Sequence, residues 1–269
     1  LIFINPRMTL AWYQKYYQEE YRDKTIENNP NRRFNLPALF EEGRRHGLAL
    51  SKIMERHLGA DGAILEVGSS AGGVLAGLRS ALTREVLGLE PSEREARFAE
   101  SQGVKTVISL MEDIDRTMTK MPKLSAIVCT QSLNHLLDPA FFLRWSHQHL
   151  VADGVLVLEV MNFRHQLKKA GFYKNAAKID HPYMFTPEVL ADFVQTAGFE
   201  ILYFATDEAG DFNPGLPDTH IRLIARRSAR LPFVKISNHA LSWFDLFKLS
   251  SVVIYCHYLW FYRLRQLFK

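Results

Sequence analysis

The most informative stretch of this chain is Ala63-Ile64-Leu65-Glu66-Val67-Gly68-Ser69-Ser70-Ala71-Gly72-Gly73. Its apolar first half predicts a buried parallel strand. The small residues of its second half predict a turn whose main chain can approach a ligand, because no large side chain intervenes. Residues 75–82 predict the helix that follows the turn. We therefore expect an α/β fold with a ligand site at the carboxyl end of this strand.

A carboxylate follows the next predicted strand. Glu90 ends the apolar run 86–89, at about the 20-residue spacing at which dinucleotide-binding folds place an acidic residue on a ribose. The turn lacks the middle glycine that lets the main chain approach a pyrophosphate. The pattern therefore favours binding of a nucleoside without phosphates. The plainer interpretation is that the glycines only allow a tight turn at the end of the strand.

Several segments resemble the class I S-adenosylmethionine-dependent methyltransferases. Residues 66–72 resemble the family's first motif, with Ser70 in place of the middle glycine. The run 130–139 is similar to its Glu-His-Leu-x-Asp-Pro turn, with Asn134 in place of the glutamate. Residues 150–159 are similar to its Leu-x-Pro-Gly-Gly turn and fifth strand, without the proline, and residues 185–200 to its helix and Ala-Gly-Phe turn. The resemblance extends over roughly residues 60–226.

The resemblance implies S-adenosylmethionine as cofactor. It also implies a Rossmann-like, doubly wound, mostly parallel seven-stranded sheet with an antiparallel strand near the C-terminus. Acidic residues after the third strand would approach the adenine, where Glu112 and Asp113 are alternatives. The cofactor-binding residues implied in this way are Glu66, Gly68, Ser69, Ser70, Gly72, Glu90, Pro91, Glu112, Asp113 and Gln131.

A histidine is the candidate general base. His135 follows the fourth predicted strand, and open α/β folds bind ligands at the carboxyl ends of their strands. An imidazole near its ordinary pKa suits proton abstraction from a hydroxyl. The alternative is that His135 only holds the turn between strand and helix by hydrogen bonding.

Two further residues are candidates for the acceptor side. His181 and Tyr183 lie just before the helix expected from Thr186, and the resemblance places substrate contacts there. A loop with a buried aromatic pair is the alternative. We expect no metal, because His147 and His149 are two apart on a predicted helix and point to different faces. Asp113 and Asp115 have no third ligand nearby in sequence.

Three zones organise the chain: a helical cap at residues 1–58, a methyltransferase domain at 59–228 and a basic aromatic helical tail at 229–269. In the cap, Trp12, Tyr13, Tyr16, Tyr17 and Tyr21 form one aromatic stripe. The stripe either packs on the main domain or forms a lid with a tyrosine hydroxyl facing the cofactor. In the middle zone, apolar strands alternate with helices, which predicts right-handed crossovers and a parallel sheet.

The tail holds most of the positive charge. From Arg226 onward eight Lys and Arg residues oppose Asp245 alone, a net charge of +7 in a chain of total charge +4. The remainder is therefore net negative, which gives no support for a nucleic-acid surface there. Residues 249–262 carry no Lys, Arg, Asp or Glu but are too short for a spanning helix, which needs about 20 residues. An interfacial membrane helix, a docking helix for a partner domain and a helix buried on its own core are open alternatives for residues 231–269.

Composition sets the remaining limits. The chain has 269 residues and 47% apolar content, enough for one domain with appendages. Two cysteines offer no disulfide framework, so we expect a cytoplasmic protein, with peripheral contact at the inner face of a membrane as an option. No signal peptide is recognisable, and an initial leucine hints at a piece of a longer protein.

These observations together predict methyl transfer from S-adenosylmethionine to a small-molecule or glycan acceptor, at an oxygen atom. The acceptor class follows from the resemblance to small-molecule and sugar methyltransferases. Two alternatives are a nucleotide-dependent oxidoreductase, and a catalytically degenerate methyltransferase fold that recruits partners or a membrane through its tail.

Overall fold

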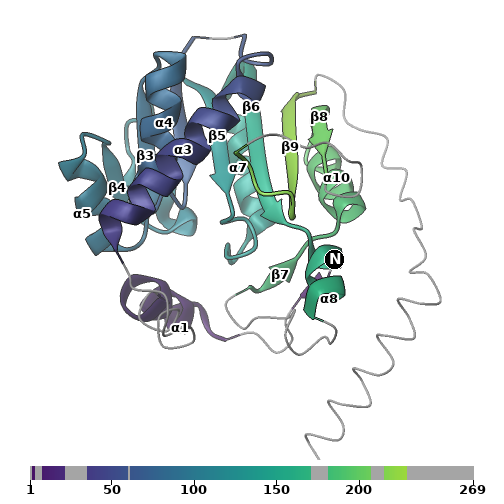
Figure 1. The fold of residues 1–269 in the computed structure, drawn as a ribbon, viewed down its shortest axis with the longest axis horizontal. Coiled ribbons are helices and arrows are strands. Elements are labelled where there is room, and N and C mark those ends of the chain that lie inside the picture. Colours follow the sequence, from purple (N-terminus) through teal and green to yellow (C-terminus); the bar gives the residue numbers. More distant parts are fainter. Residues whose placement is uncertain are drawn as a thin grey trace, which may run out of the picture.

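The computed structural model describes residues 2–3, 8–21, 35–59, 61–170, 181–206 and 215–228 (Figure 1). The run Asn28-Asn29-Pro30-Asn31 predicts a helix break, and residues 210–215 predict a loop. The first run and residues 210–214 lie outside the described residues. The basic aromatic tail beyond residue 228 lies outside them as well, so its three alternatives stay predictions.

The centre of the fold is a seven-stranded sheet in the order β4-β3-β2-β5-β6-β9-β8. The first five strands of this order are parallel, and β9 is antiparallel to both of its neighbours. This confirms the predicted Rossmann-like, mostly parallel sheet. The strands are β2 (Ala63–Val67), β3 (Val86–Glu90), β4 (Thr106–Ile108), β5 (Leu124–Thr130), β6 (Leu150–Met161), β8 (Phe199–Ala205) and β9 (His220–Arg227).

Helices cover both faces of the sheet, and successive residues of β2 point into different apolar layers. Leu65 packs in a cluster with Phe142 and Leu190, whereas Ile64 packs with Leu50 and Leu75. The helical elements are α1 (Leu10–Lys15), η1 (Tyr16–Glu20), α3 (Leu36–Met54), α4 (Gly73–Leu82), α5 (Glu93–Ser101), η2 (Met111–Asp113), α6 (Ile114–Thr117), α7 (Pro139–His149), α8 (Phe163–Ala170) and α10 (Pro187–Thr196).

Local signals in the sequence explain where these helices begin. Asp138 caps α7 by accepting a hydrogen bond from the Phe141 N–H at 2.8 Å, with proline at the first helical position. Ser92 accepts from the Glu95 N–H at 3.5 Å at the start of α5. Thr186 precedes Pro187 at the start of α10 as expected, but its side chain makes no capping hydrogen bond.

Helix α3 packs directly against α4 in front of the sheet (Figure 1). Glycines allow this close approach, since a Cβ atom on Gly47 would lie 2.2 Å from the carbonyl oxygen of Val74. The predicted cap, residues 1–58, therefore includes α3, although α3 packs in the same layer as α4. The consequence for the site is that α3 runs past the turn between β2 and α4.

The N-terminal helical turns lie beyond one end of the sheet, apart from the two helical layers (Figure 1). Tyr13 and Tyr16 are buried there, and the rings of Trp12 and Tyr16 stack at 4.9 Å. A short strand, β1 (Ile2–Phe3), pairs antiparallel with β7 (Tyr183–Met184). The N-terminal segment is thereby joined to the chain that carries His181 and Tyr183.

None of the described helices is long and apolar enough to cross a membrane. No group of three or more His, Cys, Asp or Glu side chains in the described part of the chain could hold a metal ion.

Candidate active site

A cavity of about 430 Å³ opens at the carboxyl ends of the parallel strands, within the size range of small-molecule sites. Its floor comes from the segments that follow four strands: residues 68–71 after β2, 90–92 after β3, 109–112 after β4 and 130–137 at the end of β5, apart from residue 133. Tyr17 and Tyr21 of the N-terminal turns, residues of α3, the start of α4, Met161 and His181 add to its wall.

The turn after β2 depends on glycine for its shape. Gly68 has a φ of +76°, and a Cβ atom there would lie 2.2 Å from Ser132 Oγ. Gly72 has a φ of +81°, and its Cβ atom would lie 2.8 Å from that of Ala99. Gly68 lines the cavity and Gly72 does not, so Gly72 fits the turn against α5 rather than facing a ligand.

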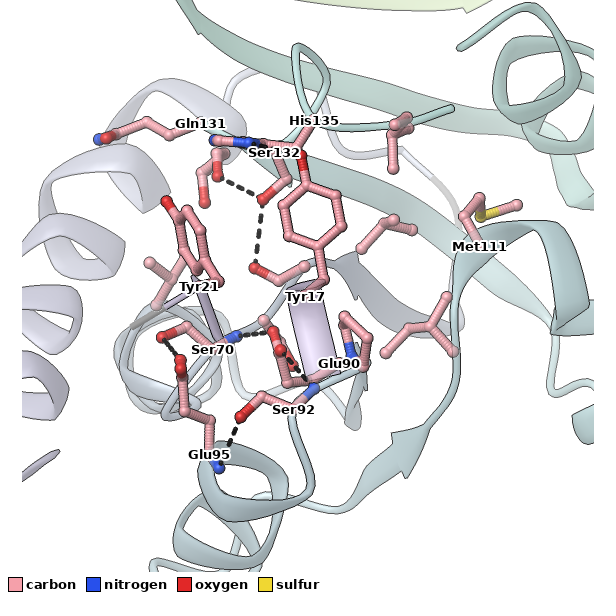
Figure 2. A pocket seen from close by; sticks show the side chains of 18 of the residues that line it. Tyr17, Tyr21, Ser70, Glu90, Ser92, Glu95, Met111, Gln131, Ser132 and His135 are labelled. Carbon is pink, nitrogen blue, oxygen red and sulfur yellow. Dashed lines mark hydrogen bonds between the residues drawn. The ribbon is translucent and has the colours of Figure 1, made fainter. Parts of the chain in front are cut away.

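Glu90 holds this turn by its side chain. Its Oε2 accepts a hydrogen bond from the Ser70 N–H at 2.8 Å, and its Oε1 accepts from the Ser92 N–H at 2.8 Å (Figure 2). Only 7% of Glu90 is exposed, at the cavity wall. Each carboxylate oxygen has two acceptor sites, so the side chain is fixed in place and can still accept hydrogen bonds from hydroxyl groups.

Ser70, which replaces the motif's middle glycine, adopts a φ of +49°. Its hydroxyl donates to Glu95 Oε2 at 2.5 Å, which connects the turn to α5 (Figure 2). The Ser92-x-x-Glu95 pattern predicts a capping box at the start of α5, but the Glu95 carboxylate is directed to Ser70 instead. The substitution therefore gives the turn a side-chain hydrogen bond that glycine could not supply.

The two acidic candidates for the adenine end occupy different places. Glu112 lines the cavity, and its Oε1 accepts hydrogen bonds from the Leu137 and Asp138 N–H groups at 3.0 and 3.2 Å. Asp113 forms an ion pair with Arg116 at 3.1 Å and is not part of the lining. The neighbouring Met111 contributes to the wall.

His135 lies among aromatic rings at the cavity wall. The Tyr17 hydroxyl is 3.2 Å from its Nδ1 atom (Figure 2). The Tyr17 and Tyr21 rings contact the imidazole edge-on at 5.7 and 5.5 Å between centroids, and His181 does so at 4.6 Å. The rings thus bring together the N-terminal turns, the loop after β5 and the segment before β7.

The two acceptor-side candidates are separated. His181 lines the cavity and is 6% exposed. Tyr183 is outside the lining, and its hydroxyl donates to the Leu137 carbonyl at 3.2 Å. Tyr183 therefore holds the loop after β5 rather than facing a ligand.

Buried charges lie behind the wall at the β6 side of the cavity. His46 of α3 lines the cavity, and its Nε2 is 3.3 Å from Glu159 Oε1. The other oxygen of Glu159 accepts from Arg222 Nε at 2.6 Å. Burial alone would raise the pKa of Glu159, but His46 and Arg222 lower it to about 2. The three residues come from α3, β6 and β9, and no local pattern in the sequence singles them out.

Glu66 is also buried rather than facing the cavity. It is 1% exposed, outside the lining, and accepts a hydrogen bond from Thr130 Oγ1 at 2.6 Å. Burial raises the pKa of its carboxyl to about 7. Of the residues singled out from the sequence, those that line this cavity are Gly68, Ser69, Ser70, Glu90, Pro91, Glu112, Gln131, His135 and His181. Glu66, Gly72, Asp113 and Tyr183 lie outside the lining.

The sequence model of a protein family described as "Methyltransferase domain" matches residues 13–203. The chain belongs to this methyltransferase family. No curated protein sequence matches the chain. The match favours the methyltransferase prediction over a nucleotide-dependent oxidoreductase.

Solved structures support the same fold. The plantazolicin methyltransferase BpumL in complex with SAH (S-adenosylhomocysteine) aligns over 81% of this chain and 94% of its own, with 13% identity and a TM-score of 0.56. A possible histamine N-methyltransferase from Thermotoga maritima aligns over 76% and 98%, with 18% identity and a TM-score of 0.50. The CcbJ methyltransferase from Streptomyces caelestis aligns over 70% and 90%, with 17% identity and a TM-score of 0.50.

The protein is an S-adenosylmethionine-dependent methyltransferase, and its cavity fits that cofactor. Glu90 is a carboxylate held in place at the cavity wall, the kind of group that binds the ribose of a nucleoside. Gly68 leaves the main chain beside it without a side chain. Among the described lining residues there is no Lys or Arg, the side chains that phosphate groups attract most strongly. The lining therefore suits a cofactor without phosphates.

Proposed function

We propose that this methyltransferase transfers the methyl group to a hydroxyl of a small-molecule or glycan acceptor, with His135 as general base. The observation that carries the proposal is the contact of the Tyr17 hydroxyl with His135 Nδ1 inside the cofactor cavity. An imidazole held through one nitrogen presents its other nitrogen in a defined direction, which is the arrangement a general base needs.

The chemistry required of the protein is modest. The bound cofactor supplies an activated methyl group from its sulfonium, so the protein has to orient the acceptor and accept one proton. In the tautomer in which Nδ1–H donates to the Tyr17 oxygen, Nε2 carries a lone pair. That nitrogen would take the proton of the acceptor hydroxyl as the methyl group passes from sulfur to oxygen and S-adenosylhomocysteine is released. The His181 ring, 4.6 Å from that of His135 between centroids, bounds the same space.

The proposal assigns the cofactor contacts along the cavity. Gly68, Ser69 and Ser70 lie under the cofactor, Glu90 and Pro91 at its ribose, Glu112 at its adenine and Gln131 at its methionyl end. Glu66, Gly72 and Asp113 support these residues from outside the cavity lining. Tyr183 acts on the acceptor side by holding the loop that carries His135.

The outer zones keep their predicted roles in this proposal. Within residues 1–58, the helical turns that carry Tyr17 and Tyr21 act as a cap, supported by these two side chains in the cavity wall. Residues 229–269 attach the enzyme to a membrane surface or a partner domain. Liposome flotation of the full chain and of a chain ending at residue 228 tests the membrane option, and equal recovery of the two would remove it.

A labelled-methyl assay tests the acceptor and the base. We expect transfer to hydroxyl compounds and glycans but not to their amine analogues, and transfer to amines alone would contradict the proposal. His135→Asn should slow turnover about 100- to 10,000-fold, as loss of a general base does, with unchanged affinity for S-adenosylhomocysteine. His57→Asn is the matched control, because His57 follows α3 and lies outside the cavity lining.

A further inference from the structure

We propose that His46 binds the carboxylate of the cofactor's methionyl part as an imidazolium, held in place by Glu159 and Arg222. The inference concerns cofactor binding alone and is independent of the acceptor and of His135. Three observations support it: the order of the strands along the cavity, the charges of the cavity lining, and the contacts of the His46 ring.

The strand order gives the direction of the bound cofactor. Along the edge of the sheet the strands follow each other as β4, β3, β2, β5 and β6. Glu112 follows β4, Glu90 ends β3 and the glycine turn follows β2. A cofactor with its adenine at Glu112 and its ribose at Glu90 therefore continues over the glycine turn toward β5 and β6. There the lining contains Gln131, Met161 and His46.

The lining offers few cations for an anionic end. Its acidic side chains are Glu42, Glu90, Glu95 and Glu112, and its histidines are His46, His135 and His181. His135 and His181 belong to the ring cluster with Tyr17 and Tyr21. His46 is thus the described side chain at the β6 side that can neutralise a carboxylate.

The surroundings of His46 favour its charged form. Burial alone lowers the pKa of His46, but the neighbouring Glu159 and Glu66 raise it more, and the net shift is upward despite Arg222. These groups come from β6, β2 and β9, and Glu42 lies one turn before His46 on α3. Arg222 and His46 in turn keep Glu159 ionised.

The geometry leaves one ring nitrogen for a ligand. The His46 side chain is 13% exposed and directs Nε2 to Glu159 Oε1 at 3.3 Å. Gln131 Nε2 approaches the same oxygen at 3.5 Å. A charged imidazole carries a proton on both nitrogens, so Nδ1–H can donate to a carboxylate while Nε2–H faces Glu159. A neutral ring in the same place would offer a weaker hydrogen bond.

A pair of ligands that differ only at this end tests the inference. S-adenosylhomocysteine carries the amino-acid group, whereas 5′-methylthioadenosine has the same adenosine and sulfur without it. We expect His46→Asn to weaken S-adenosylhomocysteine about 10- to 100-fold in titration calorimetry, the range for a hydrogen bond between charged groups. The affinity for 5′-methylthioadenosine should change less than about twofold.

Two results of this experiment would overturn the inference. Equal weakening of both ligands would mean that His46 only shapes the cavity, and unchanged affinity for both would mean that it does not contact the cofactor. His57→Asn should leave both affinities unchanged and serves as the control.

The pH dependence keeps the inference testable in the parent protein. Affinity for S-adenosylhomocysteine relative to 5′-methylthioadenosine should fall as the pH rises through the pKa of His46. Glu159→Gln removes the charge that stabilises the imidazolium, so the fall should move to lower pH, and His46→Asn should abolish it. A ratio that does not change with pH in the parent protein would overturn the inference.

Discussion

The two sides of the cofactor cavity are built in different ways. On the β3 side, the Glu90 carboxylate accepts main-chain hydrogen bonds from Ser70 and Ser92. Ser92 is only two residues from Glu90 in the sequence. On the β6 side, His46, Glu159 and Arg222 come from three separated elements and meet only in the folded chain. The first side is a local hydrogen-bonded turn and the second a buried charge network. They should therefore respond differently to substitution.

The largest expected effect is on the stability of the β6 side. Arg222→Leu leaves Glu159 buried without its guanidinium partner, and breaking a buried ion pair in this way costs about 3–5 kcal/mol. We expect the free energy of unfolding in urea to fall by that amount. The double variant with Glu159→Leu as well should recover most of it, because it removes both charges.

An exposed ion pair provides the control for this prediction. Arg97 pairs with Glu93 on the surface of α5, and exposed pairs contribute about 0.2–1 kcal/mol. If Arg222→Leu cost no more than Arg97→Leu, the β6 side would not be the charge network described above.

A pH dependence of stability should separate Glu66 from Glu159. Burial raises the carboxyl pKa of Glu66 from 4.5 to about 7. Between these two pH values the folded protein therefore keeps a proton on Glu66 that the unfolded chain has released. Its contribution to stability is complete below about pH 4.5 and is lost as the pH rises to about 7. At 1.36 kcal/mol per pKa unit, the loss amounts to about 3 kcal/mol.

Glu66→Gln should remove this decline, measured as unfolding free energy between pH 4 and 8. Glu159, with its pKa lowered to about 2, acts in the opposite sense, since its contribution is present above about pH 4.5 and is lost toward pH 2. The exposed Glu100→Gln is the control. A parallel pH profile for the parent and Glu66→Gln would contradict the assignment.

On the β3 side the expected effect is on affinity. Glu90→Gln alters the acceptor of the Ser70 and Ser92 N–H groups. In the proposed binding mode Glu90 also accepts from the ribose hydroxyls, so cofactor affinity should fall by about 1–3 kcal/mol. The loss should be equal for S-adenosylhomocysteine and 5′-methylthioadenosine, because both carry the ribose. Unequal losses would contradict the ribose assignment, and Glu93→Gln on the exposed face of α5 should have no effect.

The smallest effect is expected at Ser70. Ser70→Ala removes the hydrogen bond to Glu95 and keeps the positive φ, so the unfolding free energy should fall by about 0.5–1.5 kcal/mol. Ser70→Gly removes the same bond but relieves the left-handed backbone, and it should be the less destabilised of the two. The reverse order in thermal unfolding would show that the backbone at this position is not strained.

The same comparison explains which parts of the molecule could be predicted from the sequence. Strands β2 and β3, the glycine turn and Glu90 carry their signals within short stretches, since apolar runs, small residues and a following carboxylate are contiguous. The apolar run at residues 199–205 predicts a strand in the same way, and it forms β8. Asp138 followed by Pro139 is likewise a local signal for a helix start, and α7 begins there.

The β6 side could not be predicted because no local pattern describes it. Glu159 appears as a single charge at the end of an apolar run, and its pairing with Arg222 follows only from the register of β6 with β9. His46 is an ordinary helix residue until α3 packs beside the glycine turn. The hydrogen bond of Ser70 to Glu95 was missed for a similar reason, since a Ser-x-x-Glu pattern at residues 92–95 predicts a local cap instead.

Titration calorimetry of the parent protein with S-adenosylhomocysteine and, separately, with NAD tests the central claim that this cavity binds an adenosyl cofactor without phosphates. We expect saturable binding of S-adenosylhomocysteine at one site and no heat of binding for NAD. Binding of NAD, or the absence of any binding of S-adenosylhomocysteine, would contradict the account.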